Sequence, residues 1–161
     1  MIYLPSQVIL VSGVGSADKQ LVSFEMALRS AGIAGYNLVQ VSSILPPNVM
    51  PTKNREELKK IKNGSIVHCV LSKIQSDENN RLISAAVGVA INNNKYEHGY
   101  LSEHHAYGIT KKECGQEAEE IAKEMLITIL NDKKEITPTH ISESAVCKNK
   151  WTTVIAAAVL I

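Results

Sequence analysis

Residues 83–91 read Ile83-Ser84-Ala85-Ala86-Val87-Gly88-Val89-Ala90-Ile91, and this stretch decides the fold. Its side chains are small and mostly apolar, without a charge or a proline, which is typical of a strand in the crowded centre of a sheet. A glycine inside such a strand indicates that another backbone approaches closely there. The stretch therefore predicts a central strand against which other backbones pack.

The segments on either side of this strand are mostly strands as well. Helical spacing of apolar residues predicts only two helices, one over 19–31 and one that begins at Thr110. Gly32 stands where the first helix should end, and Thr110 with Glu113 forms a capping box for the second. The remaining strands are expected over 8–11, 36–41, 65–73, 99–107, 137–146 and 151–161, the last two as a terminal hairpin.

The order of these elements sets the fold class. Strands outnumber helices and mostly do not alternate with them, so we expect an α+β fold, with mainly antiparallel sheet covered by two helices. The length of 161 residues favours one domain, 1–161. With 45% hydrophobic and 20% charged residues, the composition is that of a globular protein and excludes disordered and fibrous classes.

Charge and aromatic content argue against a nucleic-acid partner. Seventeen Lys and Arg residues balance sixteen Asp and Glu residues, which leaves a formal net charge of +1. This balance gives no general attraction for phosphates. One Phe, one Trp and five Tyr are also too few to suggest a surface on which bases stack.

The cysteines indicate a reducing compartment. Cys69, Cys114 and Cys147 are odd in number, far apart and without a C-x-x-C pair, so they fit neither a disulfide framework nor a thiolate zinc site. The most apolar stretch, 152–161, is about half as long as a membrane-spanning helix. We therefore expect a cytoplasmic protein with no membrane partner.

The Gly13-Val14-Gly15 stretch has some likeness to a dinucleotide-binding motif, because it lies between a strand and a helix. The third glycine of that motif would fall at Asp18, whose charge would repel a pyrophosphate. We expect instead a tight turn over 12–15, followed by a helix capped by Ser16 or Asp18.

Glu103 lies among histidines on an expected strand. Because side chains alternate along a strand, Glu103 and His105 should share one face while His104 points to the other. Such ligands do not converge, so no metal site is expected. A carboxylate on an apolar strand is either one half of a structural ion pair or a general acid with a raised pKa.

The Ser42-Ser43 step follows a strand and precedes Ile44-Leu45-Pro46-Pro47, whose prolines stop further ladder or helix. Two turn serines bonded to the backbone would be the ordinary interpretation. No Gly-x-Ser-x-Gly elbow is present, which disfavours a serine hydrolase. The alternative is self-cleavage, in which the Ser43 hydroxyl attacks the Ser42 carbonyl and the resulting ester eliminates, leaving a residue that hydrolyses to a pyruvoyl group.

Over nearly its whole length the sequence resembles the pyruvoyl-dependent arginine decarboxylase family. One segment combines Phe24-Glu25-x-Ala27-Leu28 with Asn37-Leu38-x-x-x-Ser42-Ser43-x-x-Pro46-Pro47. The other combines residues 83–91 with Gly99-Tyr100-Leu101-Ser102-Glu103. The resemblance implies an αββα sandwich, assembled as homotrimers that sometimes pair into hexamers, with active sites between protomers.

The resemblance also implies roles for particular residues. Ser42 would end a β chain, 1–42, and Ser43 would begin an α chain, 43–161, as a covalent pyruvoyl group that replaces any external cofactor. Glu103 would match the proton donor, and Asn37 would help processing or substrate binding. Glu25 stands where the family commonly has an Asp that meets the guanidinium group of arginine.

The implied reaction converts L-arginine to agmatine and CO2, in polyamine biosynthesis or acid resistance. Two departures from the family leave the substrate open, because Glu25 replaces Asp and His104 and His105 replace the residues that often follow the proton donor. One alternative is the same chemistry on another amino acid. The other is a subunit that is never cleaved and only binds a small molecule or supports assembly.

Overall fold

The computed structural model describes residues 3–130 and 136–161. In chain order its elements are β1 (Val8–Ala17), α1 (Gln20–Ala31), β2 (Asn37–Gln40), β3 (Ile44–Leu45), the short 3-10 helix η1 (Leu58–Lys60), β4 (Ile66–Ser76), β5 (Leu82–Asn92), β6 (Gly99–Tyr107), α2 (Lys111–Ile127), β7 (Ile136–Val146) and β8 (Trp151–Leu160).

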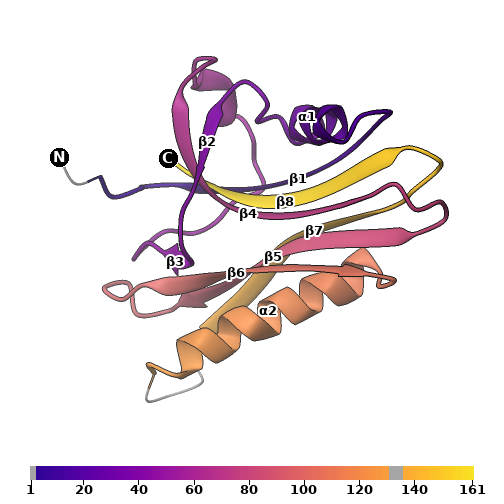
Figure 1. Ribbon diagram of the computed structural model, residues 1–161. Coiled ribbons are helices and arrows are strands. Elements are labelled where there is room, and N and C mark those ends of the chain that lie inside the picture. The colour runs from indigo at the N-terminus through magenta and orange to yellow at the C-terminus, as the bar shows by residue number, and fades with distance from the viewer. Residues whose placement is uncertain (1–2, 131–135) are drawn as a thin grey trace.

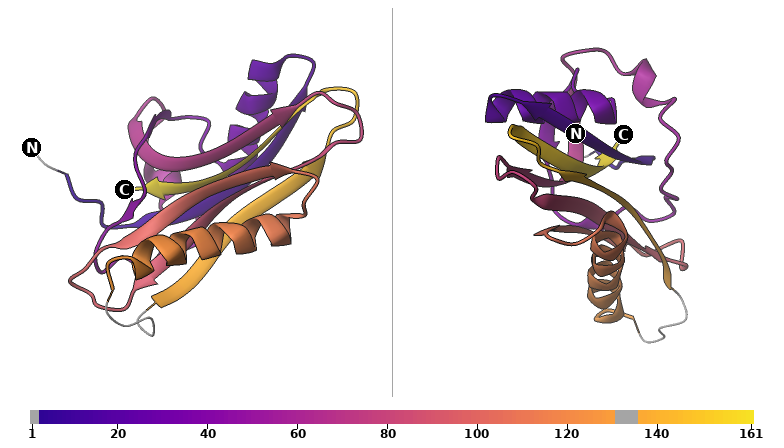
Figure 2. Two further views of the ribbon diagram at one scale, coloured as in Figure 1. Left: turned by 60° about the horizontal axis from the view of Figure 1, so that its bottom comes forward. Right: turned by 90° about the vertical axis from the view of Figure 1, so that its right-hand side faces the viewer.

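These elements form four layers, which confirms the predicted αββα sandwich (Figures 1 and 2). Sheet A has the strand order β1-β8-β4-β2, and sheet B has the order β3-β6-β5-β7. All neighbouring strands are antiparallel except β2 and β4, which run parallel. Helix α1 covers the outer face of sheet A, and α2 covers the outer face of sheet B.

Strand β5 is the crowded central strand that its sequence predicts. Val87 and Val89 pack between the sheets, whereas Ala86 and Ala90 lie under α2. A Cβ atom at Gly88 would overlap the carbonyl group of Ala118 on α2. The small side chains of β5 therefore let a helix and a second sheet pack against it at once.

The expected turn at 12–15 is wrong, because β1 continues without a break to Ala17. Helix α1 crosses β1 so closely that a Cβ atom at Gly15 would overlap backbone atoms of Ser23 and Ala27. The glycines therefore serve the contact between the helix and the strand and do not turn the chain. The expected cap is also wrong, since α1 is preceded by Lys19 and has no side-chain cap.

The expected terminal hairpin is wrong as well. Strand β7 pairs with β5 at the edge of sheet B, whereas β8 lies between β1 and β4 in sheet A. The burial of the two strands explains this separation. Nearly every residue of β8 is buried, which requires neighbours on both edges and both faces, whereas β7 is mostly half-buried and suits an edge. By contrast, the capping box at Thr110 and Glu113 is present as predicted.

Replacing Gly15 with Ala should destabilise the protein by about 1–3 kcal/mol, because the added methyl group meets backbone atoms that cannot move independently. Ser12→Ala on the same strand is the control and should change stability by less than about 0.5 kcal/mol. Urea unfolding of the two variants measures the difference. Equal stabilities would contradict the close packing of α1 on β1.

Candidate active site

The Ser42–Ser43 peptide lies where the chain crosses from sheet A to sheet B (Figure 1). Just before it, the amide of Val41 donates a hydrogen bond of 3.0 Å to the carbonyl of Cys69 on β4. Just after it, the carbonyl of Ser43 accepts a hydrogen bond of 2.7 Å from the amide of Leu101 on β6. The chain is thus anchored to sheet A just before the peptide and to sheet B just after it.

The residues that follow the serines fix the second anchor. Ile44 and Leu45 form β3 and pair with the first residues of β6. Leu45 is fully buried, and Pro46 after it is buried as well, so the chain cannot lift away from sheet B at this point. The prolines then end the strand, because they donate no hydrogen bond to a ladder. The result is a very short strand immediately after Ser43.

Glu103 lies on the same edge of β6 as the contact with Ser43. It is two residues beyond Leu101, which corresponds to about 7 Å along a strand. Leu101 packs between the sheets, so Glu103 and His105 share its face and point toward sheet A, as their spacing predicts. The side chain of Glu103 is exposed and forms no ion pair with any other residue in 3–130 or 136–161.

The surroundings of Glu103 shift its pKa upward. Partial burial of the carboxyl group raises the pKa of Glu103, and the nearby His105 opposes this rise. Burial, together with the charge of Glu103, also raises the pKa of the Cys69 thiol to about 11. Cys69 therefore remains a neutral thiol near neutral pH, and Glu103 keeps its proton to a higher pH than an ordinary glutamate.

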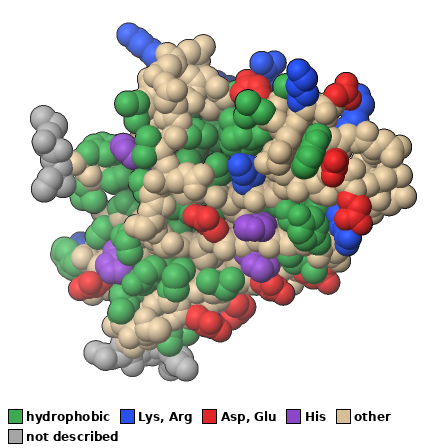
Figure 3. All heavy atoms as spheres, in the orientation of Figure 1, with side chains coloured by type: hydrophobic (Ala, Val, Ile, Leu, Met, Phe, Trp, Pro, Cys, Tyr) green, Lys and Arg blue, Asp and Glu red, His purple; other side chains and the backbone are tan. Residues whose placement is uncertain are grey.

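A cleft of about 540 Å³ opens beside Ser42. It is lined by Ser42, Ile44, His68 and Leu160, with Tyr3 at its rim stacked against His68. This volume lies within the range of about 300–1,000 Å³ that is usual for small-molecule sites. Figure 3 shows hydrophobic side chains gathered at this end of the molecule, with histidine and acidic side chains toward the middle of the same face.

Asn37 and Glu25 do not join the serines within one chain. Asn37 begins β2, and its side chain donates to the carbonyl of Gly64 (2.9 Å). Six residues of extended chain, about 20 Å, separate it from Ser43. Glu25 lies on α1 and pairs with Arg29 at 2.9 Å, with 40% of its side chain exposed.

Glu25 is only half-buried, because helix α1 turns a different face toward sheet A. Ala27 and Leu28 pack against sheet A, whereas Met26 beside Glu25 is exposed. A helix turns by about 100° per residue, so the neighbours of Glu25 in sequence do not share its direction. Glu25 is therefore presented on the outside of the sandwich.

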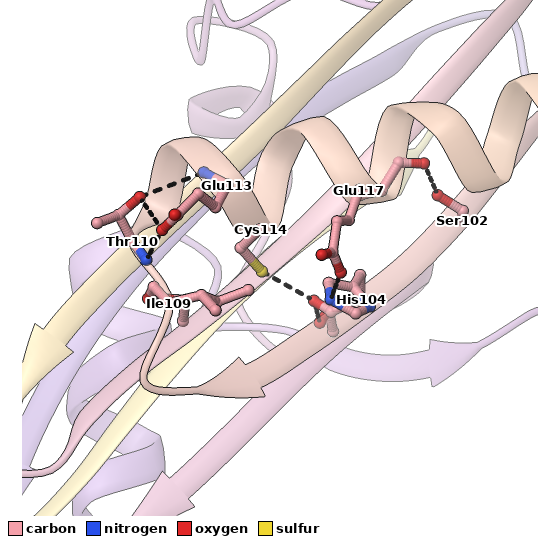
Figure 4. A network of polar contacts seen from close by, with 10 residues as sticks. Ser102, His104, Ile109, Thr110, Glu113, Cys114 and Glu117 are labelled. Carbon is pink, nitrogen blue, oxygen red and sulfur yellow. Dashed lines mark hydrogen bonds and ion pairs between the residues drawn. The ribbon is translucent and has the colours of Figure 1, made fainter.

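The other face of β6 is fixed to α2 (Figure 4). The hydroxyl of Ser102 donates to the carbonyl of Ala118 at 2.5 Å. The ring Nε2 of His104 lies 2.8 Å from the carboxylate of Glu117. The angle at this contact does not allow a hydrogen bond. On the opposite side, toward sheet A, the carbonyl of His104 accepts a 2.7 Å hydrogen bond from Ser72 on β4.

Ser72 and the backbone groups of Cys69 and Leu101 that anchor the serines are not predicted from the sequence. Backbone donors and acceptors leave no pattern in a sequence, because every non-proline residue carries them. Ser72 does leave a signal, since it is a single hydroxyl inside the strand Val70-Leu71-Ser72, where a buried polar group needs a partner.

Within the described ranges, 3–130 and 136–161, no three His, Cys, Asp or Glu side chains come together in a way that could hold a metal ion. In the same ranges no helix is both long and apolar enough to cross a membrane. The three cysteines are free thiols and all are buried.

Comparisons with known proteins identify the family. The family model described as pyruvoyl-dependent arginine decarboxylase matches residues 7–161. A protein of that name from Thermoplasma volcanium is 44% identical over 177 aligned residues, which cover 99% of this chain and 97% of the relative. Another from Methanocella arvoryzae is 45% identical over 161, covering 98% and 96%. A third from Chlorobaculum tepidum, named as probable, is 42% identical over 180, covering 100% and 99%. The chain belongs to the pyruvoyl-dependent arginine decarboxylase family.

Proposed function

We propose that this chain cuts itself between Ser42 and Ser43 and then converts L-arginine to agmatine and CO2. The observation that carries the proposal is the Ser42–Ser43 peptide held between the two sheets, with Glu103 beyond it on the same edge of β6. The name of the family and of its relatives supports both the pyruvoyl group and arginine as the substrate. Residues 1–161 form one domain, which becomes two chains, 1–42 and 43–161.

The cleavage needs only the serines and water. The Ser43 hydroxyl adds to the Ser42 carbonyl carbon, and the peptide C–N bond breaks to leave an ester and a free amine. Loss of the Cα proton of Ser43 then breaks its Cβ–O bond, which releases Ser42 as a carboxylate and leaves dehydroalanine. Water hydrolyses this residue, ammonia departs, and residue 43 becomes a pyruvoyl group.

The surroundings of residue 43 fit such a group. The Leu101 amide and the pairing of β3 with β6 hold residues 43–45 independently of the bond to Ser42. The cleft beside Ser42 provides room for an amino acid. A pyruvoyl group supplies a carbonyl that accepts the electrons left behind when CO2 departs from the substrate.

Glu103 is the proton donor in this proposal. Decarboxylation leaves a carbanion at the substrate Cα, which a positioned acid must protonate. Burial raises the pKa of Glu103, so a larger fraction of this acid is protonated at a given pH than for an ordinary glutamate. Its place two residues beyond Leu101 puts it on the face of β6 that carries the contact with Ser43.

Glu25 and Asn37 bind the substrate from a second copy of the chain. Within one chain they lie away from Ser43, so a site that uses all four residues requires an interface between copies. Exposed apolar side chains beside the cleft would be covered by that contact, among them Tyr3, Leu4 and Ile44. We therefore propose a homo-oligomer, a trimer or a hexamer, with its sites between protomers.

The mass of the purified protein tests the cleavage. We expect two pieces of about 4.6 and 13.0 kDa, in proportion to 42 and 119 of the 161 residues in a 17.6 kDa chain. Ser43→Ala should remain whole, because it lacks the attacking hydroxyl. A wild-type mass that stays intact after long incubation would contradict the proposal and favour an uncleaved binding subunit.

Glu103→Gln should lower turnover by about 10²–10⁴-fold, because an amide cannot deliver the proton. In the wild type, turnover should fall as the pH rises through the pKa of Glu103, which burial raises above that of an ordinary glutamate. The release of CO2 by the cleaved fraction, followed across pH, measures both effects.

His105→Asn is the control for this pH dependence. Its imidazole lowers the pKa of Glu103, so its removal should move the fall in turnover to higher pH while Glu103 remains in place. Full activity of a cleaved Glu103→Gln protein would exclude Glu103 as the proton donor.

Glu25→Gln should raise the KM for arginine strongly while cleavage at Ser42–Ser43 continues. A carboxylate accepts two charge-assisted hydrogen bonds from a guanidinium group, and an amide loses both the charge and one acceptor. Glu25→Asp keeps the charge and should retain arginine binding. Steady-state kinetics of the wild type, Glu25→Gln and Glu25→Asp with arginine, lysine and ornithine would reveal whether another amino acid is the substrate. An unchanged KM for arginine in Glu25→Gln would show that the guanidinium group binds elsewhere.

A further inference from the structure

We propose that the Ser72 hydroxyl holds β4 and β6 at the separation that the Ser42–Ser43 peptide spans, which makes Ser72 a positioning residue for self-cleavage. The proposal rests on the function proposed above. Ser72 is 1% exposed, and its Oγ donates a 2.7 Å hydrogen bond to the carbonyl of His104. This bond joins sheet A directly to sheet B.

The bond differs in kind from the other contacts between the sheets. Most of that space is filled by apolar side chains such as Val70, Ile74 and Val87. Apolar packing excludes water, but each of its contacts is non-directional. A hydrogen bond weakens steeply when its length or angle changes, so it fixes the register of the two strands that it joins.

The Ser72 bond joins the same two strands as the serine crossing. The crossing is anchored at Cys69 on β4 and at Leu101 on β6. Ser72 and His104 each lie three residues further along these strands, a distance of about 10 Å on both. The crossing chain and the Ser72 bond are therefore two connections between β4 and β6, and a change in one alters the span of the other.

Near Ser72 and His104, β4 and β6 each have a strand partner on one edge only within the described residues. β2 ends at Gln40, opposite Cys69, and β3 pairs with β6 only at Gly99 and Tyr100. Beyond these points the outer edges of β4 and β6 have no strand partner in the described part of the chain. The position of β6 there depends on β5, on α2 and on Ser72.

Glu103 depends on the same bond. The carbonyl that Ser72 holds belongs to His104, the residue that follows Glu103 on β6. Among the described residues, the one other side chain that donates to this carbonyl is the Cys114 thiol, at 3.7 Å from the α2 side. Without the Ser72 bond, β6 would keep its pairing with β5 and its apolar packing but would lose this directional link to sheet A beside Glu103.

Four variants of the full chain test the proposal. Thr and Val have the same shape and differ by a hydroxyl, so Ser72→Thr and Ser72→Val isolate the hydrogen bond. Ser84 provides a matched control, because it is also fully buried and its Oγ donates to a backbone carbonyl, that of Ile109 at 2.5 Å, away from the crossing. The rate of self-cleavage is followed by intact mass from the moment of synthesis.

We expect Ser72→Val to cleave at least tenfold more slowly than Ser72→Thr, while Ser84→Val and Ser84→Thr cleave at equal rates. A role in stability alone would slow both valine variants together. Equal cleavage by Ser72→Val and Ser72→Thr, in a protein whose wild type cleaves, would overturn this proposal and leave the proposed function standing.

Hydrogen exchange gives a second measurement that does not depend on cleavage. In the Ser43→Ala background the Leu101 amide keeps its acceptor, the carbonyl of residue 43. Adding Ser72→Val, or Ser72→Ala if the valine variant does not fold, should speed exchange at Leu101 at least tenfold, whereas Ser84→Val should not. A wild type that never cleaves would overturn the proposed function, and unchanged exchange at Leu101 would overturn the role of Ser72.

Discussion

The separation of the two sheets governs the rest of this molecule. Small side chains in the two central strands, Ala85 and Val87 on β5 and Ala156 and Ala158 on β8, let the sheets pack face to face. Stacked sheets lie about 10 Å apart, which is about three residues of extended chain. The segment Val41–Ser43 has just that length available between its anchors on β4 and β6. The chain therefore crosses there with little slack, and the two serines occupy the crossing.

Cleavage at this crossing would cost the sandwich little. Residues 1–42 include β1, which pairs with β8 along its whole length, and α1, which packs on sheet A. Residues 1–42 also include β2, and residues 43–161 supply the strands from β3 to β8. The two pieces would thus remain bound to each other through strand pairing and packing in sheet A. The new chain end at residue 43 would stay beside Leu101.

The features that the sequence predicted are those with a local cause. The capping box at Thr110, the end of α1 at Gly32 and the opposite faces of His104 and His105 each follow from a few neighbouring residues. Apart from the cap expected for α1, the wrong predictions concern contacts between distant segments. The close approach of α1 explains Gly13 and Gly15, and the burial of β8 separates it from β7, but neither partner lies nearby in the sequence.

In the candidate site, too, the residues whose positions have a local cause differ from those placed by distant segments. Ser43 and Glu103 lie along the same edge of β6, because short hydrogen-bonded segments place Ser43 opposite Leu101. Glu25 and Asn37 do not, since their positions are set by α1 and by the start of β2. Ser72 was missed because its importance comes from a carbonyl 32 residues away.

The two glutamates that carry the proposed chemistry are placed in environments that suit opposite tasks. Glu103 must hold a proton, and partial burial raises its pKa. Glu25 must offer a charged acceptor, and it already binds one guanidinium group, that of Arg29. This pair is solvent-exposed and so contributes only about 0–1 kcal/mol, which makes Arg29 easy to displace. The guanidinium group of a substrate would therefore replace the guanidinium group of Arg29 at the Glu25 carboxylate. Helix α1 already presents this carboxylate on the outside of the sandwich.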